Sequence, residues 1–188
     1  MLDYAAMNVR RVVTGHDVSG KSVFVSDEQV APIEPMLMPT AEFHRLWGGD
    51  HPSRFPGDGA QPDHVSYFPP IGGFRFGLFS LPPDDLHPPD DLDIGAAVAD
   101  LEAGMPGMMR YMDMTEPGMH TTDTIDFEIV LEGTVTLELD DGEMVTLQPG
   151  DTVVQNGTRH RWGNPGTTTA RLAVFMVGAN HAGVTPAT

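Results

Sequence analysis

From residue 120 onward, short segments that alternate apolar and polar residues are separated by tight turns, and this pattern constrains the fold more than any other feature of the sequence. In "TVTLELDDGEMVTL" (134–147), Val135, Leu137 and Leu139 alternate with polar residues until "DDG" turns the chain. "QPGD" then predicts a second turn, "TVVQNGTRHRW" a third strand and "TARLAVFMVGA" a fourth. Short strands with closely spaced turns predict an all-β sandwich or barrel.

The first half of the chain has a different composition. Residues 8–30 predict two short strands around a glycine-containing turn, and these can extend the same sheets. Twelve of the 17 prolines fall between residues 32 and 89, and proline breaks helices and interior strands. We expect a mostly irregular, proline-rich arm with brief extended pieces such as 74–81, packed on the domain or on a partner subunit. "DDLDIGAAVADLEAG" (90–104) predicts one short helix, with aspartates at its start and a glycine at its end.

Composition limits which partners the protein can bind and which metal ligands it can supply. The 188 residues suit one structural domain, in which N-terminal strands, arm and helix (1–104) pack on a barrel core (105–188). A formal net charge of −17 repels phosphate backbones and anionic lipid, so we expect no nucleic-acid and no membrane partner. The sequence shows neither an apolar span of about 20 residues nor the apolar centre of a signal peptide. It also lacks cysteine, which excludes thiolate metal ligands and fits a cytoplasmic protein.

Parity along the strands predicts a polar lumen. On the strand that begins at residue 120, Asp126, Glu128 and Val130 share one face, and on the later strand His160 and Trp162 share a face. Neighbouring strands of a small barrel direct alternate side chains into one lumen. Two histidines and one carboxylate form a ligand set that leaves open positions on Fe(II) and that also suits other divalent ions.

Spacing around the first of these strands follows a recognisable motif. Counting back from Gly133, the chain matches H-x-H, three residues, E, six residues, G, with His120 as the first histidine. Thr122 stands at the second histidine and Asp126 at the glutamate. A glycine would precede this motif, but Gly118 lies too close to His120 to match it.

A second motif lies on the later strand. In P-x-G-x2-H-x3-N, the chain matches Gly157, His160 and Asn164, with Gln155 in place of the proline, and "PGD" at 149–151 supplies the turn before it. Together the two motifs resemble those of the cupin family, over residues 118–178. The resemblance implies a double-stranded β-helix, or jelly-roll, barrel with the N-terminal proline-rich arm and one short helix added to it.

Cupins commonly hold one divalent metal ion through three histidines and a glutamate. The resemblance therefore implies a metal site made by His120, Asp126 and His160, with Fe(II) favoured and Zn, Mn or Ni as alternatives. Glu128 faces the same way as Asp126 and is the alternative ligand or the general base, so both carboxylates are catalytic candidates. The residues expected to line the pocket are Thr122, Trp162 and Val130.

For the remaining polar residues we expect positions at the surface, in the arm or at the barrel mouth. Arg159 and Arg161 flank His160 and should point outward, into surface ion pairs. His64 and Tyr67 can reach the mouth of the barrel if the arm folds over it. The histidines without ligand spacing, which we expect at the surface or in the arm, are His16, His44, His51, His64, His87 and His181.

The leading hypothesis is a mononuclear metal-dependent enzyme that acts on a small oxygen-rich organic molecule, with dioxygenase-type and lyase or isomerase chemistry both open. The alternative is a metal-free, non-catalytic barrel that binds a small molecule. Exposed sheet edges and an aromatic-rich arm favour a homodimer with exchanged or clasping arms.

Overall fold

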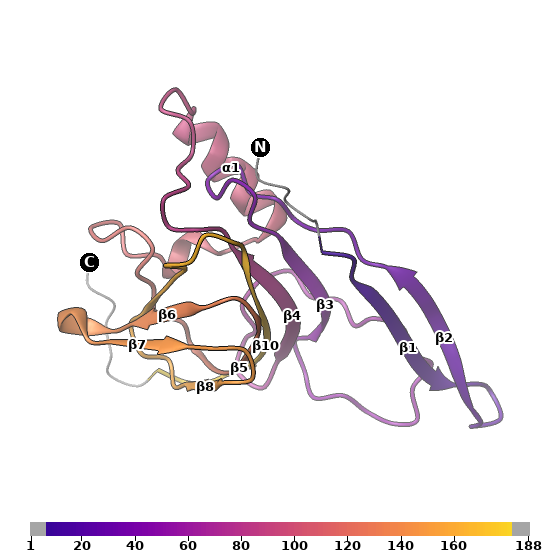
Figure 1. The fold of residues 1–188 in the computed structure, drawn as a ribbon. Coiled ribbons are helices and arrows are strands. Elements are labelled where there is room, and N and C mark those ends of the chain that lie inside the picture. The colour runs from indigo at the N-terminus through magenta and orange to yellow at the C-terminus, as the bar shows by residue number, and fades with distance from the viewer. Residues whose placement is uncertain (1–6, 182–188) are drawn as a thin grey trace.

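The computed structural model describes residues 7–181, and within that range ten strands and one α-helix form a two-sheet barrel with a hairpin beside it (Figure 1). All the strand pairs are antiparallel. The five-stranded sheet has the order β3 (Phe43–Gly49), β4 (Phe74–Leu81), β10 (Ala170–Gly178), β5 (Thr124–Glu132) and β8 (Thr152–Gln155). The three-stranded sheet has the order β7 (Met144–Leu147), β6 (Val135–Glu138) and β9 (Arg161–Gly163). The predicted all-β jelly-roll barrel is confirmed.

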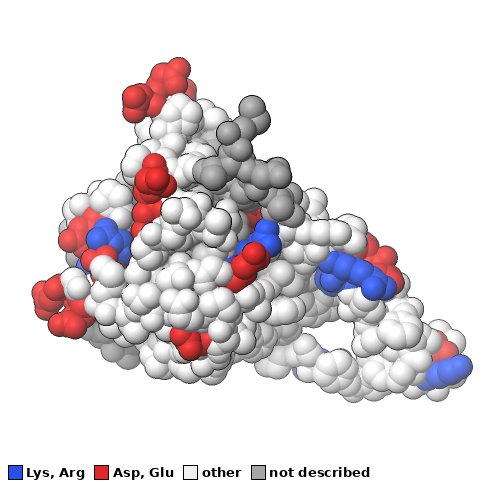
Figure 2. Space-filling model, viewed as in Figure 1, with Lys and Arg blue, Asp and Glu red and all other residues white. Residues whose placement is uncertain are grey.

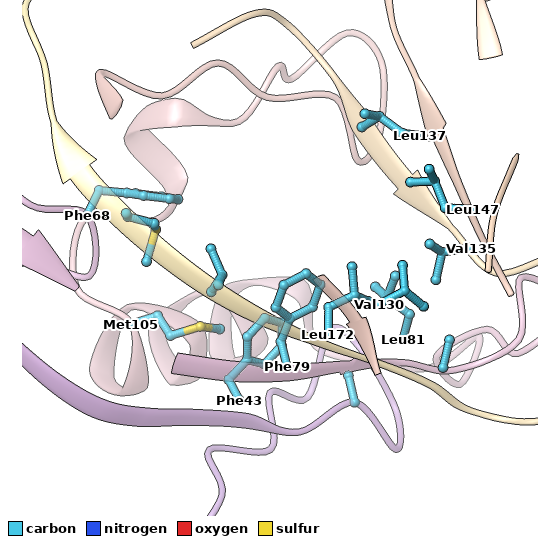
Figure 3. Packing of buried hydrophobic residues seen from close by; sticks show 14 of the residues in the cluster. Phe43, Phe68, Phe79, Leu81, Met105, Val130, Val135, Leu137, Leu147 and Leu172 are labelled. Carbon is cyan, nitrogen blue, oxygen red and sulfur yellow. The ribbon is translucent and has the colours of Figure 1, made fainter. Parts of the chain in front are cut away.

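The core lies between the two sheets. Val130 and Leu172 project from the larger sheet, and Val135 and Leu137 project from the smaller one, so alternate residues of each strand meet in a common apolar layer (Figure 3). All four side chains are buried. Burial of such a side chain stabilises a fold by roughly 1.5–3 kcal/mol, which makes this layer the main support of the barrel.

The predicted helix is present as α1 (Ile94–Gly104) and begins four residues later than the first aspartate of its segment. Asp93 is its N-cap and accepts a hydrogen bond of 3.0 Å from the Ala96 backbone N–H. Leu101 anchors the helix to the core. Short 3₁₀ turns occur at Met109–Tyr111 and Asp140–Gly142. No helix among residues 7–181 is long and apolar enough to cross a membrane.

Two N-terminal strands are also present, but they do not extend the barrel sheets as we had predicted. β1 (Arg10–His16) and β2 (Ser22–Gln29) form a separate hairpin that projects from the barrel (Figure 1). The chain that follows β2 occupies the edge of β3, because Ile33 and Phe43 exchange backbone hydrogen bonds of 2.8 and 2.9 Å. The hairpin therefore does not pair with β3 as a further strand, and it contacts β3 through Arg11, which donates to the Leu46 carbonyl at 2.7 Å.

The proline-rich segment contains more barrel structure than its composition indicates. β4 coincides with the predicted extended piece at 74–81, but β3 was missed and forms an edge of the larger sheet. Two of the five strands thus precede residue 105, so the barrel sheet is not confined to 105–188. Residues 40–51 contain no proline, which leaves room for one regular strand. His44 lies on it and is 1% exposed, so the prediction of a surface or arm position was wrong for this histidine.

Residues 152–162 were predicted as one strand and instead form two, β8 and β9, in different sheets. The chain turns at Gly157, whose φ of +58° is unfavourable for residues with a side chain. This crossing places His160 between the sheets. The first strand of this region also begins later than predicted, at Thr124, and His120 forms an isolated bridge before it.

Candidate active site

The barrel brings His120 and His160 together. Their backbones form an isolated antiparallel bridge, with a 2.9 Å hydrogen bond in each direction, and their ring centroids are 4.2 Å apart. Residues 40 positions apart in the sequence therefore present adjacent imidazoles. Their role as metal ligands stays a prediction.

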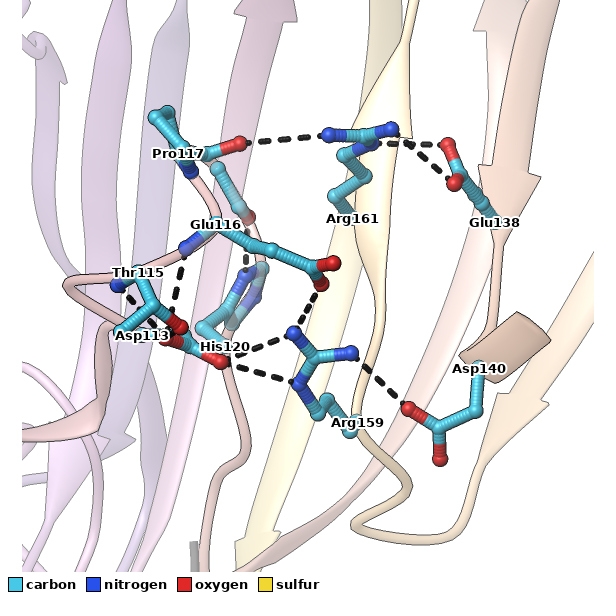
Figure 4. Close-up of polar contacts among 10 residues, drawn as sticks. Asp113, Thr115, Glu116, Pro117, His120, Glu138, Asp140, Arg159 and Arg161 are labelled. Atoms are coloured by element: carbon cyan, nitrogen blue, oxygen red, sulfur yellow. Dashed lines mark hydrogen bonds and ion pairs between the residues drawn. The ribbon is translucent and has the colours of Figure 1, made fainter. Parts of the chain in front are cut away.

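An ion-pair network at the surface holds this junction (Figure 4). Arg159 donates to Asp113 at 2.8 Å, to Asp140 at 2.9 Å and to Glu116, which ties the loop before His120 to the end of β6. The hydrogen bonds from Thr115 and Arg159 lower the pKa of the Asp113 carboxyl. The predicted outward direction and ion pairing of Arg159 agree with this arrangement, and Arg161 behaves likewise.

Both imidazoles are neutral at pH 7. Burial and the neighbouring His120 ring lower the pKa of His160 to about 3, and burial also lowers the pKa of His120. The Nδ1 atoms lie 3.0 Å from the Gly118 carbonyl and 2.9 Å from the Thr158 carbonyl, respectively. A carbonyl only accepts, so donation from His120 Nδ1 leaves the lone pair of that ring on Nε2, whereas His160 Nδ1 faces both the Thr158 carbonyl, an acceptor, and the Gln155 amide nitrogen, a donor.

Two buried carboxyl groups lie on the inner face of β5, with the parity that the sequence predicts. Asp126 is 5% exposed and Glu128 is 7% exposed. Asp126 Oδ1 and Glu128 Oε2 are buried without any hydrogen-bond partner among the described residues. Burial raises the pKa of Asp126 to about 6, against a lowering by the Thr124 hydroxyl, and burial with the nearby Asp126 raises the pKa of Glu128 to about 8.

Gln155 links the two parts of the site and was not singled out as a functional residue from the sequence. It is paired with Asp126 across β5 and β8, it is 3% exposed, and its amide nitrogen lies 2.7 Å from His160 Nδ1. The same nitrogen donates to the Thr158 carbonyl at 2.9 Å. Its position in the second motif, where cupins have proline, was the available signal.

Tyr67 comes from the proline-rich segment and lies near the carboxyl groups. Burial, together with Asp126 and Glu128, raises the pKa of its phenol, and nearby Arg45 opposes this increase. Its ring packs edge-on against Phe43, with centroids 6.4 Å apart. From the sequence we expected this tyrosine at the barrel mouth if the arm folds over it, but we predicted no role for it.

The three predicted pocket residues occupy different places. Thr122 is buried and accepts a 2.8 Å hydrogen bond from the Thr124 hydroxyl. Val130 packs in the apolar core. Trp162 is partly buried, with its ring 6.4 Å from that of His160, and it lines a cavity of about 200 Å³ between the segments 37–39 and 81–86.

The predicted metal centre does not assemble from these side chains. An unpartnered Asp126 oxygen and two imidazole lone pairs are suitable donors. However, among the described residues no three or more histidine, aspartate or glutamate side chains gather closely enough to hold an ion. The arrangement does not fit a three-ligand centre, and metal binding stays a prediction.

Comparison with known proteins agrees with this geometry. Residues 107–177 match the family described as Cupin domain. The chain is 31% identical over 173 residues to phomopsin biosynthesis cluster protein C' of Diaporthe leptostromiformis, which covers 88% of this chain and 76% of that protein. It is 38% identical over 93 residues to oryzines biosynthesis cluster protein J of Aspergillus oryzae, 48% of this chain but only 46% of the relative. It is 25% identical over 181 residues to the cupin-domain-containing oxidoreductase fogC of Aspergillus ruber, covering 92% and 73%.

The double-sheet barrel and its two motifs define a small β-barrel protein with a polar lumen. The chain belongs to the cupin superfamily.

Proposed function

We propose that this protein is an enzyme that binds a small oxygen-rich organic molecule inside the barrel and transfers a proton through Asp126 and Glu128. The observation that supports this most directly is the pair of buried carboxyl oxygens without partners. A buried polar atom without a hydrogen bond costs about 1–3 kcal/mol, so a folded chain keeps such a pair only if something else supplies the partner. A bound substrate would do so.

The two carboxyl groups are suited to different roles. With pKa values of about 6 and about 8, the pair holds roughly one proton at pH 7, so Asp126 is mostly ionised and Glu128 mostly neutral. Asp126 is therefore the base that removes a proton from carbon next to a carbonyl, and Glu128 is the acid that returns one. This revises the sequence-based assignment of Glu128 as the base.

The names of the relatives are consistent with small-molecule chemistry. One is called an oxidoreductase, and two are called biosynthesis cluster proteins. Proton removal next to a carbonyl is the first step of an isomerisation or elimination, and it also precedes an oxidation that uses O2. We place this chemistry in the cytoplasm, which the absence of cysteine supports.

Hydrogen–deuterium exchange tests the proton transfer. In D2O the protein should catalyse exchange of the C3 protons of 2-oxobutanoate or of a related small carbonyl compound, followed by NMR. Asp126→Asn and Glu128→Gln should each lower the rate at least about 100-fold, because positioned acids and bases typically contribute this much. Glu132→Gln, on the same strand but exposed, should leave the rate unchanged. Binding of these compounds without exchange would contradict catalysis and favour the non-catalytic barrel.

Metal-dependent oxidation is the second candidate, and the adjacent imidazoles favour it. The Nε2 lone pair of His120 is available for a divalent ion, and so is that of His160 when its Nδ1 carries the proton; Asp126 could complete the set only if its side chain moved toward them. A bound ion would supply Lewis-acid or O2 chemistry.

Elemental analysis after loading with Fe(II), Zn, Mn or Ni tests this second candidate. The expected result is about one ion per chain, lost in both His120→Ala and His160→Ala and retained in His87→Ala, whose side chain is exposed. Equal metal content in all four proteins would refute it. Oxygen uptake with the same carbonyl compounds would separate oxidation from isomerisation.

A further inference from the structure

Arg45 lies on the inner face of the larger sheet, at the same end of the barrel as the carboxyl pair. Phe43, two residues earlier on β3, packs in the core with its ring centroid 6.1 Å from that of Phe79. Side chains two residues apart on a strand share a face, so Arg45 also faces the interior. Directly opposite Arg45 on β4 is Gly77, which has no side chain to cover the guanidinium.

The strand register connects Arg45 to Glu128. Arg45 is paired with Gly77, Gly77 with Val174 on β10, and Val174 with Glu128 on β5. Directly opposed residues of antiparallel strands point to the same face. Arg45 and Glu128 therefore stand at the two ends of one inner row, three strand spacings or about 14 Å apart along the sheet. No ion pair joins Arg45 to either carboxyl group in the part of the chain that the structure describes.

Arg45 is a partly buried cation without a counter-ion. It makes no hydrogen bond or ion pair with any residue among 7–181, although the chain has 27 acidic residues. Burial and nearby Arg75 lower the pKa of its guanidinium, but arginine remains charged at neutral pH. By contrast, Arg75 is buried and paired with Asp50 at 2.6 Å. A partly buried guanidinium without a counter-ion is a suitable site for an anion from outside the chain.

Tyr67 packs beside this row, because its ring lies edge-on against Phe43, two residues before Arg45 on β3, with centroids 6.4 Å apart. Nearby Arg45 lowers the pKa of its phenol, and burial with Asp126 and Glu128 raises it. Its hydroxyl has no hydrogen-bond partner among the described residues, and its ring also packs against Phe68 at a centroid distance of 5.1 Å. The phenol is thus an unused donor beside the row.

We infer that Arg45 and Tyr67 recognise a small organic monoanion, a 2-oxo carboxylate, with the carboxylate on the Arg45 guanidinium and the neighbouring carbonyl oxygen on the Tyr67 hydroxyl. This inference rests on the proposed proton transfer and names its substrate class. One unpaired guanidinium matches a carboxylate in a bidentate manner and balances its single charge, whereas a phosphate dianion would carry one charge more than Arg45 supplies. Arg75, whose charge acts on Arg45, is already paired with Asp50.

This binding mode orients the substrate for the proposed step. Asp126 takes the proton from the carbon next to the carbonyl, the C–H electron pair forms a C=C bond as the C=O π pair moves onto oxygen, and the Tyr67 O–H donates to this enolate oxygen. Glu128 then returns a proton to carbon, the C=O bond re-forms, and proton exchange with solvent restores ionised Asp126 and neutral Glu128. A phenol aimed at the developing negative charge acts as an oxyanion donor.

A cavity lies at the barrel end next to this row. A cavity of about 260 Å³ adjoins the ends of β5 and β10 and lies beyond the inward-facing Thr124. Pro69 and Pro70, which follow the Tyr67–Phe68 pair, form one of its walls. The remaining lining residues are Ile71, Arg110, Tyr111, Asp123, Ala179, Asn180 and His181.

Calorimetric titration with 2-oxobutanoate and its methyl ester tests the anion recognition, because esterification removes the negative charge and adds one methyl group. The acid should bind the native protein at least about tenfold more tightly than the ester, the discrimination expected for a charged hydrogen bond. Arg45→Gln should abolish this preference, and Arg45→Lys should retain part of it. Arg54→Gln, which alters an exposed arginine, should behave as native. Circular dichroism and thermal unfolding verify that each variant is folded.

Several outcomes would overturn the inference. These are equal affinity for acid and ester, no binding of either compound, an unchanged preference in folded Arg45→Gln, or tighter binding of inorganic phosphate than of the oxo acid. Tyr67→Phe adds a readout of positioning, since it should slow deuterium exchange at least about tenfold while acid binding changes less.

Failure of the proposed function gives a different result. If Arg45-dependent binding of the acid persists without any exchange, proton transfer is refuted and anion recognition stands. If the ester binds and exchanges as well as the acid, anion recognition is refuted and proton transfer stands. Glu128→Gln separates the two proposals, because this variant should lose catalysis of deuterium exchange and still bind the acid more tightly than the ester.

Discussion

Asp126 and Glu128 couple the chemistry of the barrel to its stability. In each group burial favours the neutral form, so the folded-state pKa lies above the ordinary value of 3.8 or 4.5. A group of this kind contributes stability that is fully present below its ordinary pKa and that is lost as the pH rises through the folded-state value. These two carboxyl groups therefore stabilise the fold less as the pH rises.

We predict that the free energy of unfolding falls between about pH 4 and pH 8, from the ordinary pKa values of the two carboxyl groups to their folded-state values. The loss should amount to a few kcal/mol, since one pKa unit corresponds to about 1.4 kcal/mol. Glu128→Gln should remove most of this slope, because an amide does not ionise. Glu132→Gln, which lies on the same strand with an exposed side chain, should keep the native slope. Urea unfolding at several pH values measures this, and a flat native profile would show that the pair is solvated.

At the level of strands, the turn between β5 and β6 is the most demanding. Gly133 has a φ of +79°, and a Cβ there would lie 2.7 Å from the Ala170 Cα at the start of β10. Gly142 has a similar φ of +74° in the turn that joins β6 and β7, but a Cβ there would meet open space. The two glycines therefore share the backbone strain and differ in the clash.

Alanine at each glycine should separate these two costs. Gly142→Ala should destabilise the protein by about 1–2 kcal/mol, the cost of a left-handed conformation for a residue with a side chain. Gly133→Ala should cost clearly more, about 3 kcal/mol or above, because backbone at the base of the core must also move. Chemical denaturation of the two variants measures the difference. Equal losses would mean that the β5–β6 turn adjusts freely.

Strand periodicity was sufficient to predict the barrel from the sequence, but it was insufficient to predict how some of its strands are connected. Alternation identified β5, β6, β7 and β10, and the two motifs identified the histidines that meet. It could not separate β8 from β9, because Gly157 changes the backbone direction without interrupting the polar pattern. β3 was hidden in a proline-rich context.

Local sequence patterns likewise predicted only part of the candidate site. Parity within a strand placed Asp126 and Glu128 correctly on one face, because that depends only on local geometry. Arg45 and Tyr67 approach them through the pairing of strands and segments that are far apart in the sequence, which no local pattern encodes. The distance from the histidines to the carboxyl groups, on which metal binding depends, is also a tertiary property.

At the scale of the whole molecule, charge and apolar surface are segregated. Acidic side chains are spread over the visible face of the barrel, and on the hairpin basic side chains lie beside acidic ones (Figure 2). The outer face of the larger sheet is different. One transverse row across four strands is apolar and exposed, and it consists of Phe76, Phe175, Phe127 and Val154, with exposed fractions of 41%, 41%, 46% and 55%.

This apolar row supports the proposal of a homodimer. A contiguous exposed apolar surface is typical of an interaction site. In a chain of net charge −17, a second copy is a suitable occupant because the same uncharged row can pack against itself around a twofold axis without bringing carboxylates together. The projecting β1–β2 hairpin, with Phe24 80% exposed, has the apolar surface to clasp such a partner, since an isolated two-stranded hairpin is marginally stable.

We therefore predict that the native protein elutes as a dimer in size-exclusion chromatography with light scattering, and that Phe175→Glu shifts it to a monomer. A charge at the centre of the row must be desolvated twice in a symmetric interface, which should weaken association at least 100-fold. Met144→Glu places the same charge on an exposed residue of the smaller sheet and should leave the dimer intact. A native monomer, or a Phe175→Glu dimer of unchanged affinity, would show that this face is not the interface.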